Sequence, residues 1–259
     1  MAIRVTVYGE NSHEKQENHP ISGIYPNGMH EAIADGIREQ LGDAVTVKTV
    51  VLQDPEHGLT EEVLANTDVL TWWGHMAHGQ VEDAIVDRIH ARVMGGMGIL
   101  CLHSAHYSKI FRKLMGTSCS LCWRDGDSEA VWNVAPGHPI TEGVPMIFQI
   151  PEHEMYGEYF DIPPPDELIF ISNFSGGEIF RSGCTWRRGY GKVFYFSPGH
   201  ESNPIYHQAE IKRIIANSVK WLAPTMPSTP YAPGAPQAKP GWWKNGGHEP
   251  MAPLATAAE

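Results

Sequence analysis

The chain has 259 residues, with 19 Lys and Arg against 30 Asp and Glu, so its formal net charge is -11. Hydrophobic residues make up 42% of it, which fits a packed globular core and excludes wholesale disorder. Such an acidic chain, without a basic patch, is not expected to bind nucleic acid. Its apolar runs are too short for a membrane helix, and four cysteines indicate no disulfide framework, so we predict a cytoplasmic protein.

The first 115 residues alternate short apolar runs with segments of helical periodicity. Apolar residues recur every four positions in the helical segments, and the runs between them are rich in β-branched residues. Such alternation predicts parallel strands with right-handed crossovers, that is, a doubly wound α/β sheet. The expected strands are residues 3–8, 45–52, 69–73 and 98–102, and the expected helices are 29–41, a short one from 60, 81–93 and 110–114.

The rest of the chain loses this alternation. Strand-like segments at 147–150, 168–172, 178–180 and 192–196 are expected to extend the sheet, some of them antiparallel at its edge, before a last helix at 205–221. We therefore predict one α/β domain over residues 1–223. Residues 224–259 are rich in Pro, Ala and Gly and are predicted to be an extended tail, whose Trp242-Trp243 pair we expect to dock on the body or on another subunit.

Histidines follow four of the predicted strands, at the point where each strand ends. They are His13, His75, His103 and His200. Ligands bind beyond the carboxyl ends of strands in open α/β sheets, and imidazole is both a common metal ligand and an acid-base group near neutral pH. A single such histidine can equally be a cap or a hydrogen-bonded rim residue. Together, the four predict a metal site or an acid-base site.

An acidic segment follows the strand expected at 147–150. Because strand residues alternate between faces, Glu152, Glu154 and Tyr156 are expected to point the same way. A partly buried Glu154 beside histidines could be a metal ligand or a general base with a raised pKa. The alternative is a solvated acidic loop.

The cysteines do not form a recognisable reactive site. Cys101 lies within the strand expected at 98–102 without the glycines of a nucleophile turn, so we predict that it is buried and dispensable. Ser104, at the turn itself, remains an alternative nucleophile. The Cys119/Cys122 pair lacks the second pair of a structural zinc site, so we do not expect a zinc finger. The glycines at 95–98 precede a strand instead of linking a strand to a helix, so we expect no phosphate-binding loop and no nucleotide.

Several short motifs, in this order, resemble the trehalose-utilisation (ThuA-like) family over residues 3–223. They are Trp72-Trp73-Gly74-His75, Leu102-His103-Ser104, His138-Pro139-Ile140-Thr141, Glu154-Met155-Tyr156 and Ser197-Pro198-Gly199-His200. The resemblance implies a fold like that of the class I glutamine amidotransferase domain, with a flavodoxin-like sheet. It also implies a role in the catabolism of trehalose or related disaccharides, alongside a dehydrogenase and on keto-sugar intermediates. The family lacks the amidotransferase cysteine, and this chain has His103 or Ser104 at that position, which argues against glutamine hydrolysis.

These observations predict an enzyme for a small sugar or keto-sugar, such as an isomerase, epimerase or hydrolase. The predicted roles are catalysis by His103, Glu154 and His13, zinc binding by His75, His103 and His200, and substrate binding by Trp72, Trp73, Tyr156 and Ser104. A metal-free pocket in which the same histidines move protons is the main alternative mechanism. A non-catalytic sugar-binding or regulatory module, having less need of several imidazoles, is the alternative function. We also expect a homo-oligomer.

Overall fold

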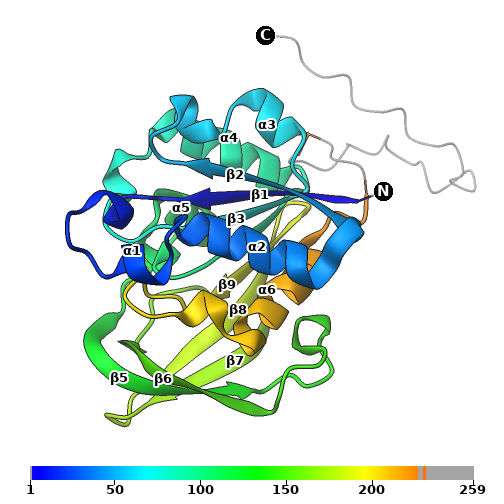
Figure 1. The fold of residues 1–259 in the computed structure, drawn as a ribbon. Helices are drawn as coiled ribbons and strands as arrows, with labels where there is room; N and C mark the ends of the chain where they lie inside the picture. The colour runs from blue at the N-terminus through cyan, green and yellow to red at the C-terminus, as the bar shows by residue number, and fades with distance from the viewer. Residues whose placement is uncertain (1, 227–229, 232–259) are drawn as a thin grey trace, which may run out of the picture.

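The computed structural model describes residues 2–226 and 230–231 of the chain. Its centre is one nine-stranded sheet with the strand order β2-β1-β3-β4-β9-β8-β7-β5-β6 (Figure 1). The tail predicted from residue 224, including the Trp242-Trp243 pair, lies largely outside the described residues. No helix in the described part of the chain is long and apolar enough to cross a membrane.

Five strands form the parallel half of the sheet, and they confirm the predicted doubly wound α/β arrangement. They are β1 (Ile3–Gly9), β2 (Val45–Val51), β3 (Val69–Trp73), β4 (Gly98–Cys101) and β9 (Gly191–Phe196), paired in the order β2-β1-β3-β4-β9. Every residue of β3 and β4 is buried, as expected for strands covered on both faces.

Helices cover both faces of this half. Helices α2 (Met29–Leu41) and α6 (Ala209–Leu222) pack on one face, and α4 (Asp83–Met94) and α5 (Lys109–Met115) pack on the other, with the short α3 (Glu61–Ala65) beside α4 (Figure 1). Neighbouring strand residues therefore enter different cores: Trp72 packs on the α4 side and Trp73 on the α2 side. A short helix, α1 (Ile21–Ile24), precedes α2.

Four strands extend the sheet beyond β9 as an antiparallel half. They are β8 (Ile179–Arg188), β7 (Glu167–Phe174), β5 (Cys122–Asn133) and β6 (Ile147–Gly157), with β6 at the edge. The predicted antiparallel extension is confirmed, but β5 was not predicted and β6 and β8 are longer than expected. The pattern of β5 was hidden because its first five residues are all exposed and its pairing with β6 is interrupted by register shifts.

The last helix also begins later than predicted. Residues Ile205–His207 form a separate 3-10 turn, and α6 starts at Ala209.

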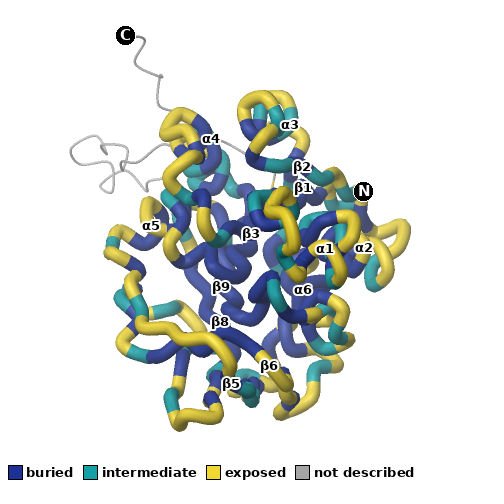
Figure 2. Tube along the Cα trace, turned by 60° about the vertical axis from the view of Figure 1, so that its left-hand side comes forward, coloured by how far each residue is buried: buried dark blue, intermediate teal, exposed yellow. Residues whose placement is uncertain are grey.

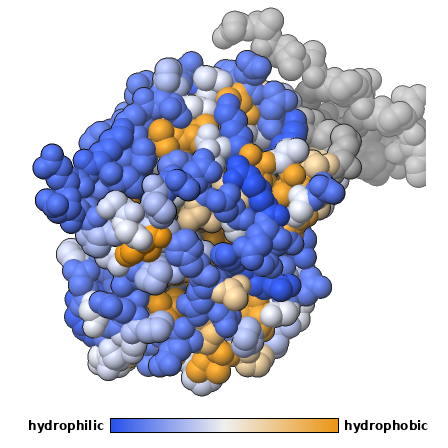
Figure 3. Space-filling model, viewed as in Figure 1, coloured by the Kyte–Doolittle hydropathy of each residue, from blue (hydrophilic) through white to orange (hydrophobic). Residues whose placement is uncertain are grey.

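Figure 2 shows where burial concentrates: the strands in the middle of the sheet are dark blue, while the outer helices and β5 carry long exposed stretches. The face seen in Figure 3 is mostly hydrophilic with separate apolar spots, in keeping with the acidic composition.

Candidate functional site

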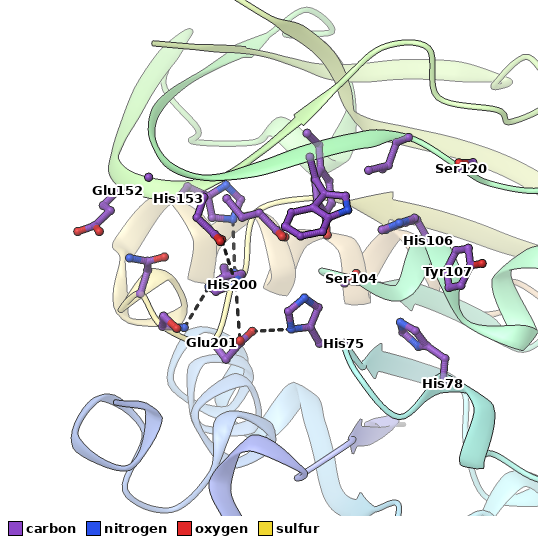
Figure 4. A pocket seen from close by; sticks show the side chains of 18 residues that line it. His75, His78, Ser104, His106, Tyr107, Ser120, Glu152, His153, His200 and Glu201 are labelled. Atoms are coloured by element: carbon purple, nitrogen blue, oxygen red, sulfur yellow. Dashed lines mark hydrogen bonds and ion pairs between the residues drawn. The ribbon is translucent and has the colours of Figure 1, made fainter. Parts of the chain in front are cut away.

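A cavity of about 760 Å³ lies where the carboxyl ends of β3, β4 and β9 face β5 and β6 (Figure 4). Loops after the parallel strands supply His75, Ser104 and His200, and β6 supplies Glu154 and Tyr156. This is the position at which open α/β sheets bind their ligands. The cavity therefore combines one wall from each half of the sheet.

Four side chains converge here: His75, Glu154 and His200 line the cavity, and the fully buried His103 lies beside them. Ligand atoms of His75, His103, Glu154 and His200 all lie within 4.8 Å of one another. His103, Glu154 and His200 are buried and His75 is partly exposed. The three histidines predicted to hold zinc are thus brought together, with Glu154 as a fourth member of the cluster.

The loop that carries His75 is held by Glu10, which directly follows β1. The buried Glu10 carboxylate accepts the backbone N–H groups of His75 at 2.8 Å and of Met76 at 3.0 Å. These charge-assisted hydrogen bonds tie the end of β1 to the loop after β3. This role of Glu10 was not predicted, because nothing in the local sequence indicates a partner 65 residues away.

His103 and Glu154 face each other across the base of the cavity. Nδ1 of His103 lies 2.9 Å from the Ser197 carbonyl oxygen, which can only accept, so the ring proton is on Nδ1. The Nε2 lone pair then points at Oε2 of Glu154, 2.9 Å away, with the Tyr156 hydroxyl at 3.2 Å. Burial lowers the pKa of His103 well below its ordinary value, so the ring is neutral. Two acceptors at this distance require a proton or a cation between them.

His75 is oriented by Glu201. Its Nδ1 lies 3.1 Å from Oε2 of Glu201, which is itself buried (Figure 4). Burial opposes charge on both partners, but their hydrogen bond and mutual attraction prevail: the pKa of His75 is raised and that of Glu201 is lowered. With Nδ1 directed at a carboxylate, Nε2 of His75 is left for a ligand, which is the usual arrangement of a metal-bound histidine.

His200 has the opposite tautomer to that of His103. The Ser202 N–H donates to its Nδ1 at 3.2 Å, so in the neutral ring the proton is on Nε2. Burial lowers the pKa of His200 to about 4, which keeps the ring neutral near pH 7. In this tautomer His200 offers a hydrogen-bond donor rather than a lone pair.

A buried Glu-His pair fixes the backbone at His200. Nδ1 of His153 lies 2.6 Å from Oε2 of Glu129, and both side chains are almost fully buried. Nε2 of His153 accepts the N–H groups of Gly199 at 3.1 Å and of His200 at 3.4 Å. The pair was missed because Glu129 lies in the unpredicted strand β5 and His153 was not singled out within its acidic segment.

The predicted aromatic residues are divided between core and cavity. Trp72 stacks on Tyr8, Trp73 donates its Nε1–H to the Gly199 carbonyl at 3.0 Å, and both are buried outside the cavity lining. This placement favours packing over sugar contact. Tyr156 and Ser104 do line the cavity, together with Trp123, which is 62% exposed and was not predicted.

The remaining predicted residues lie around the cluster. His13 is buried beside it, with its ring 5.2 Å from that of His75, but it is not one of the four converging residues. Glu152 lines the cavity and is exposed. Cys101 is fully buried in β4 and outside the lining, and burial raises the pKa of its thiol, so the predicted burial is confirmed.

The lining carries negative charge without a permanent positive one. Among the described residues that line the cavity there is no Lys or Arg, whereas four carboxylates line it: Asp125, Glu152, Glu154 and Glu201. A concave site with charges of one sign attracts ions of the other sign. The cavity is therefore suited to a cation and to a neutral organic ligand, and unsuited to an anionic one.

Comparisons with known proteins agree with this fold. Two solved ThuA-like structures match with a TM-score of 0.59 each: one from Parabacteroides merdae (14% identity, 87% of this chain and 92% of that one) and one from Bacteroides uniformis (16% identity, 85% and 91%). A cytoplasmic protein from Salmonella typhimurium matches at 11% identity and a TM-score of 0.55 over 75% of this chain and 87% of that one. A comparison with curated proteins gives no match. The sequence profile of the ThuA family, described as trehalose utilisation, matches residues 4–222, so the chain belongs to the ThuA family.

Proposed function

We propose that this ThuA-family protein is a metal-assisted enzyme that acts on a neutral sugar or keto-sugar in trehalose utilisation. The observation that carries the proposal is the approach of His103 Nε2 and Glu154 Oε2 to 2.9 Å in a cavity lined with histidines. Family membership supports the substrate class, and the cluster supports the chemistry.

The donor set favours zinc. Two imidazoles and one carboxylate, from His75, His103 and Glu154, match three-ligand catalytic zinc sites and leave one coordination position open. Magnesium and calcium prefer sites built of oxygen atoms alone. His75 and His103 each direct Nδ1 at an acceptor, Glu201 and the Ser197 carbonyl respectively, which leaves Nε2 for the ion.

The chain's own groups would handle the substrate's oxygens and protons. A bound divalent ion would supply polarisation of a carbonyl or activation of a water molecule. The Nε2–H of His200 would donate to an oxygen that gains negative charge, and the Tyr156 hydroxyl, whose pKa is raised well above normal by burial, would stay protonated beside it. An oxygen of Glu154 would accept a proton from the carbon next to a ketone, the step common to isomerisation, epimerisation and elimination.

The charge of the cavity supports a neutral substrate. Phosphorylated and carboxylated sugars would meet four carboxylates and no compensating Lys or Arg in the described lining. Trp123 exposes most of its ring surface at the cavity and suits stacking on the apolar face of a sugar. The cavity volume, about 760 Å³, lies within the range of small-molecule sites.

The test is direct conversion of sugars, followed by NMR. Trehalose, its keto derivative made by a sugar dehydrogenase, and a phosphorylated sugar are each incubated with the purified full-length chain. We expect conversion of the keto-sugar, loss of activity with a chelator, restoration by zinc, and at least 100-fold loss in Glu154→Gln. Binding of sugar without conversion of any of them would contradict an enzymatic role and favour a binding module. Full activity in chelator at sub-stoichiometric metal would contradict the metal and leave acid-base catalysis by the same residues.

A further inference from the structure

A second group of metal-binding side chains lies beside the first. Ligand atoms of His13, His19 and Glu201 lie within 4.8 Å of one another. His13 follows β1 in a 3-10 turn, His19 lies just before α1, and Glu201 comes from the loop after β9. None of them belongs to the group formed by His75, His103, Glu154 and His200.

Glu201 connects the two groups through its two carboxylate oxygens. Oε2 lies 3.1 Å from Nδ1 of His75, while Oε1 lies 3.4 Å from Nε2 of His13 and 3.6 Å from Nε2 of His200. Glu201 is 3% exposed, and no Lys or Arg among the described residues forms an ion pair with it. A buried carboxylate with only imidazoles as partners lacks a permanent counter-charge.

The buried His13 ring in this second group lacks one hydrogen bond. It is 6% exposed, and its Nδ1 has no hydrogen-bond partner among the described residues. Its other ring nitrogen, Nε2, lies 3.4 Å from Oε1 of Glu201, which is longer than a normal hydrogen bond and suits two ligands each ~2.0–2.2 Å from one zinc ion. The His19 ring lies 5.0 Å from the His13 ring, on the more exposed side.

We propose that His13, His19 and Glu201 form a second divalent cation site, joined to the first by the Glu201 carboxylate. Glu201 would then bind the second ion through Oε1 and, through Oε2, orient His75, a ligand of the first ion. The second site goes beyond the proposed function, which needs one ion.

His19 is the weakest of the three ligands. It is only partly buried, and because the Ile21 N–H donates to its Nδ1 at 3.2 Å, Nε2 is the nitrogen left for the ion. His13 and Glu201, which are buried, carry most of the affinity. We therefore expect His19→Ala to weaken the second ion and His13→Asn to abolish its binding.

Metal stoichiometry tests the proposal. The full-length chain is stripped with chelator, titrated with Zn²⁺ and Co²⁺ separately, and analysed by calorimetry and elemental analysis. We expect two equivalents for the unaltered chain, one for His13→Asn, and a second equivalent weakened at least ten-fold for His19→Ala. His90→Ala, on α4 and in neither group, is the control and should still bind two. Circular dichroism and thermal unfolding confirm that each variant is folded.

The outcomes separate this proposal from the proposed function. One equivalent in the unaltered chain, unchanged by His13→Asn but lost in His103→Ala, would overturn the second site and keep the first. One equivalent lost in both variants would indicate a single shared ion and would also overturn it. No bound metal at all would overturn both.

Discussion

The two halves of the sheet contribute different chemistry to the cavity. The parallel half delivers nitrogen donors from the ends of β3, β4 and β9, namely His75, His103 and His200. The antiparallel half delivers Glu154 and Tyr156 from β6 and the exposed Trp123 from β5. The cluster lies where the two halves meet, so neither half is sufficient alone.

The halves also differ in how they are packed. Residues of β3 and β4 are buried throughout, between helices on both faces, whereas β5 has five successive exposed residues and interrupted pairing with β6. A doubly covered parallel sheet is a stiff base for histidines that must keep their positions. In the proposed function the antiparallel extension is the side that would receive the sugar, because the first five residues of β5 are exposed.

The largest expected effect is on the base of the cluster in the parallel half. His103→Ala removes a buried ligand and leaves Glu154 without its partner, so we expect zinc affinity to fall more than about 100-fold, since outer-shell changes alone cost 10–100-fold. Competition with a chromogenic chelator measures the change. Unchanged affinity in a folded variant would show that the ion does not use this cluster.

A smaller effect is expected in the antiparallel half, on the binding of the substrate and not on the binding of the metal. Trp123→Ala should raise KM for the sugar about ten-fold, equivalent to about 1.4 kcal/mol of stacking, with kcat and metal content unchanged. Trp132→Ala is the matched control, because Trp132 is exposed on the same strand but outside the cavity lining. Equal effects of the two substitutions would refute a contact between Trp123 and the sugar.

The pH dependence of stability offers a third comparison, through His106 in the cavity wall. Burial lowers the pKa of His106 well below the usual value, so on acidification the unfolded chain takes up its proton first. Stability is therefore lost as pH falls below about 6.5, by about 1.4 kcal/mol per pH unit from this residue. Urea unfolding of metal-stripped protein between pH 7.5 and 5.5 should show a shallower dependence in His106→Leu. If the unfolding free energies of the two proteins changed with pH in the same way, His106 would not be the source of this pH dependence.

The smallest effect is expected at Cys101, which lies in β4 beside the cluster. Cys101→Ala should keep full activity and lose about 1 kcal/mol of unfolding free energy, as for removal of one buried heavy atom. Activity assays and chemical denaturation measure both quantities. Complete loss of turnover in a folded variant would instead support covalent catalysis.

The parallel half was predictable because local patterns determine it. Apolar runs covered on both faces and helices with a four-residue stripe are visible without tertiary information, and the histidines at strand ends follow from them. The strand β5 was not predictable, because Arg124 and Asp127 at its start pair with Glu178 and Ser175 of a distant segment rather than showing an alternating pattern. Trp72 and Trp73 were assigned to a sugar, but in a doubly covered strand both faces are core.

The partners of the histidines were the other unpredictable part. Glu201, Glu129 and Glu10 each act on a residue that is near only in the folded chain: His75, His153 and the backbone at His75. Local sequence gives no signal for such pairs, since their members are 126, 24 and 65 positions apart in the chain, respectively. Residue type at strand ends identified the donors, and tertiary geometry was needed to tell which of them face one another.

The central claim is that a divalent ion is held among His75, His103 and Glu154. Anomalous diffraction at the zinc absorption edge, from crystals of the full-length chain grown with zinc, tests it most directly. We expect a strong peak within coordination distance of these three side chains, absent from crystals of His103→Ala. If the crystals showed zinc peaks at other positions but none among these side chains, and the side chains were hydrogen-bonded to one another, the proposed ion site would be contradicted.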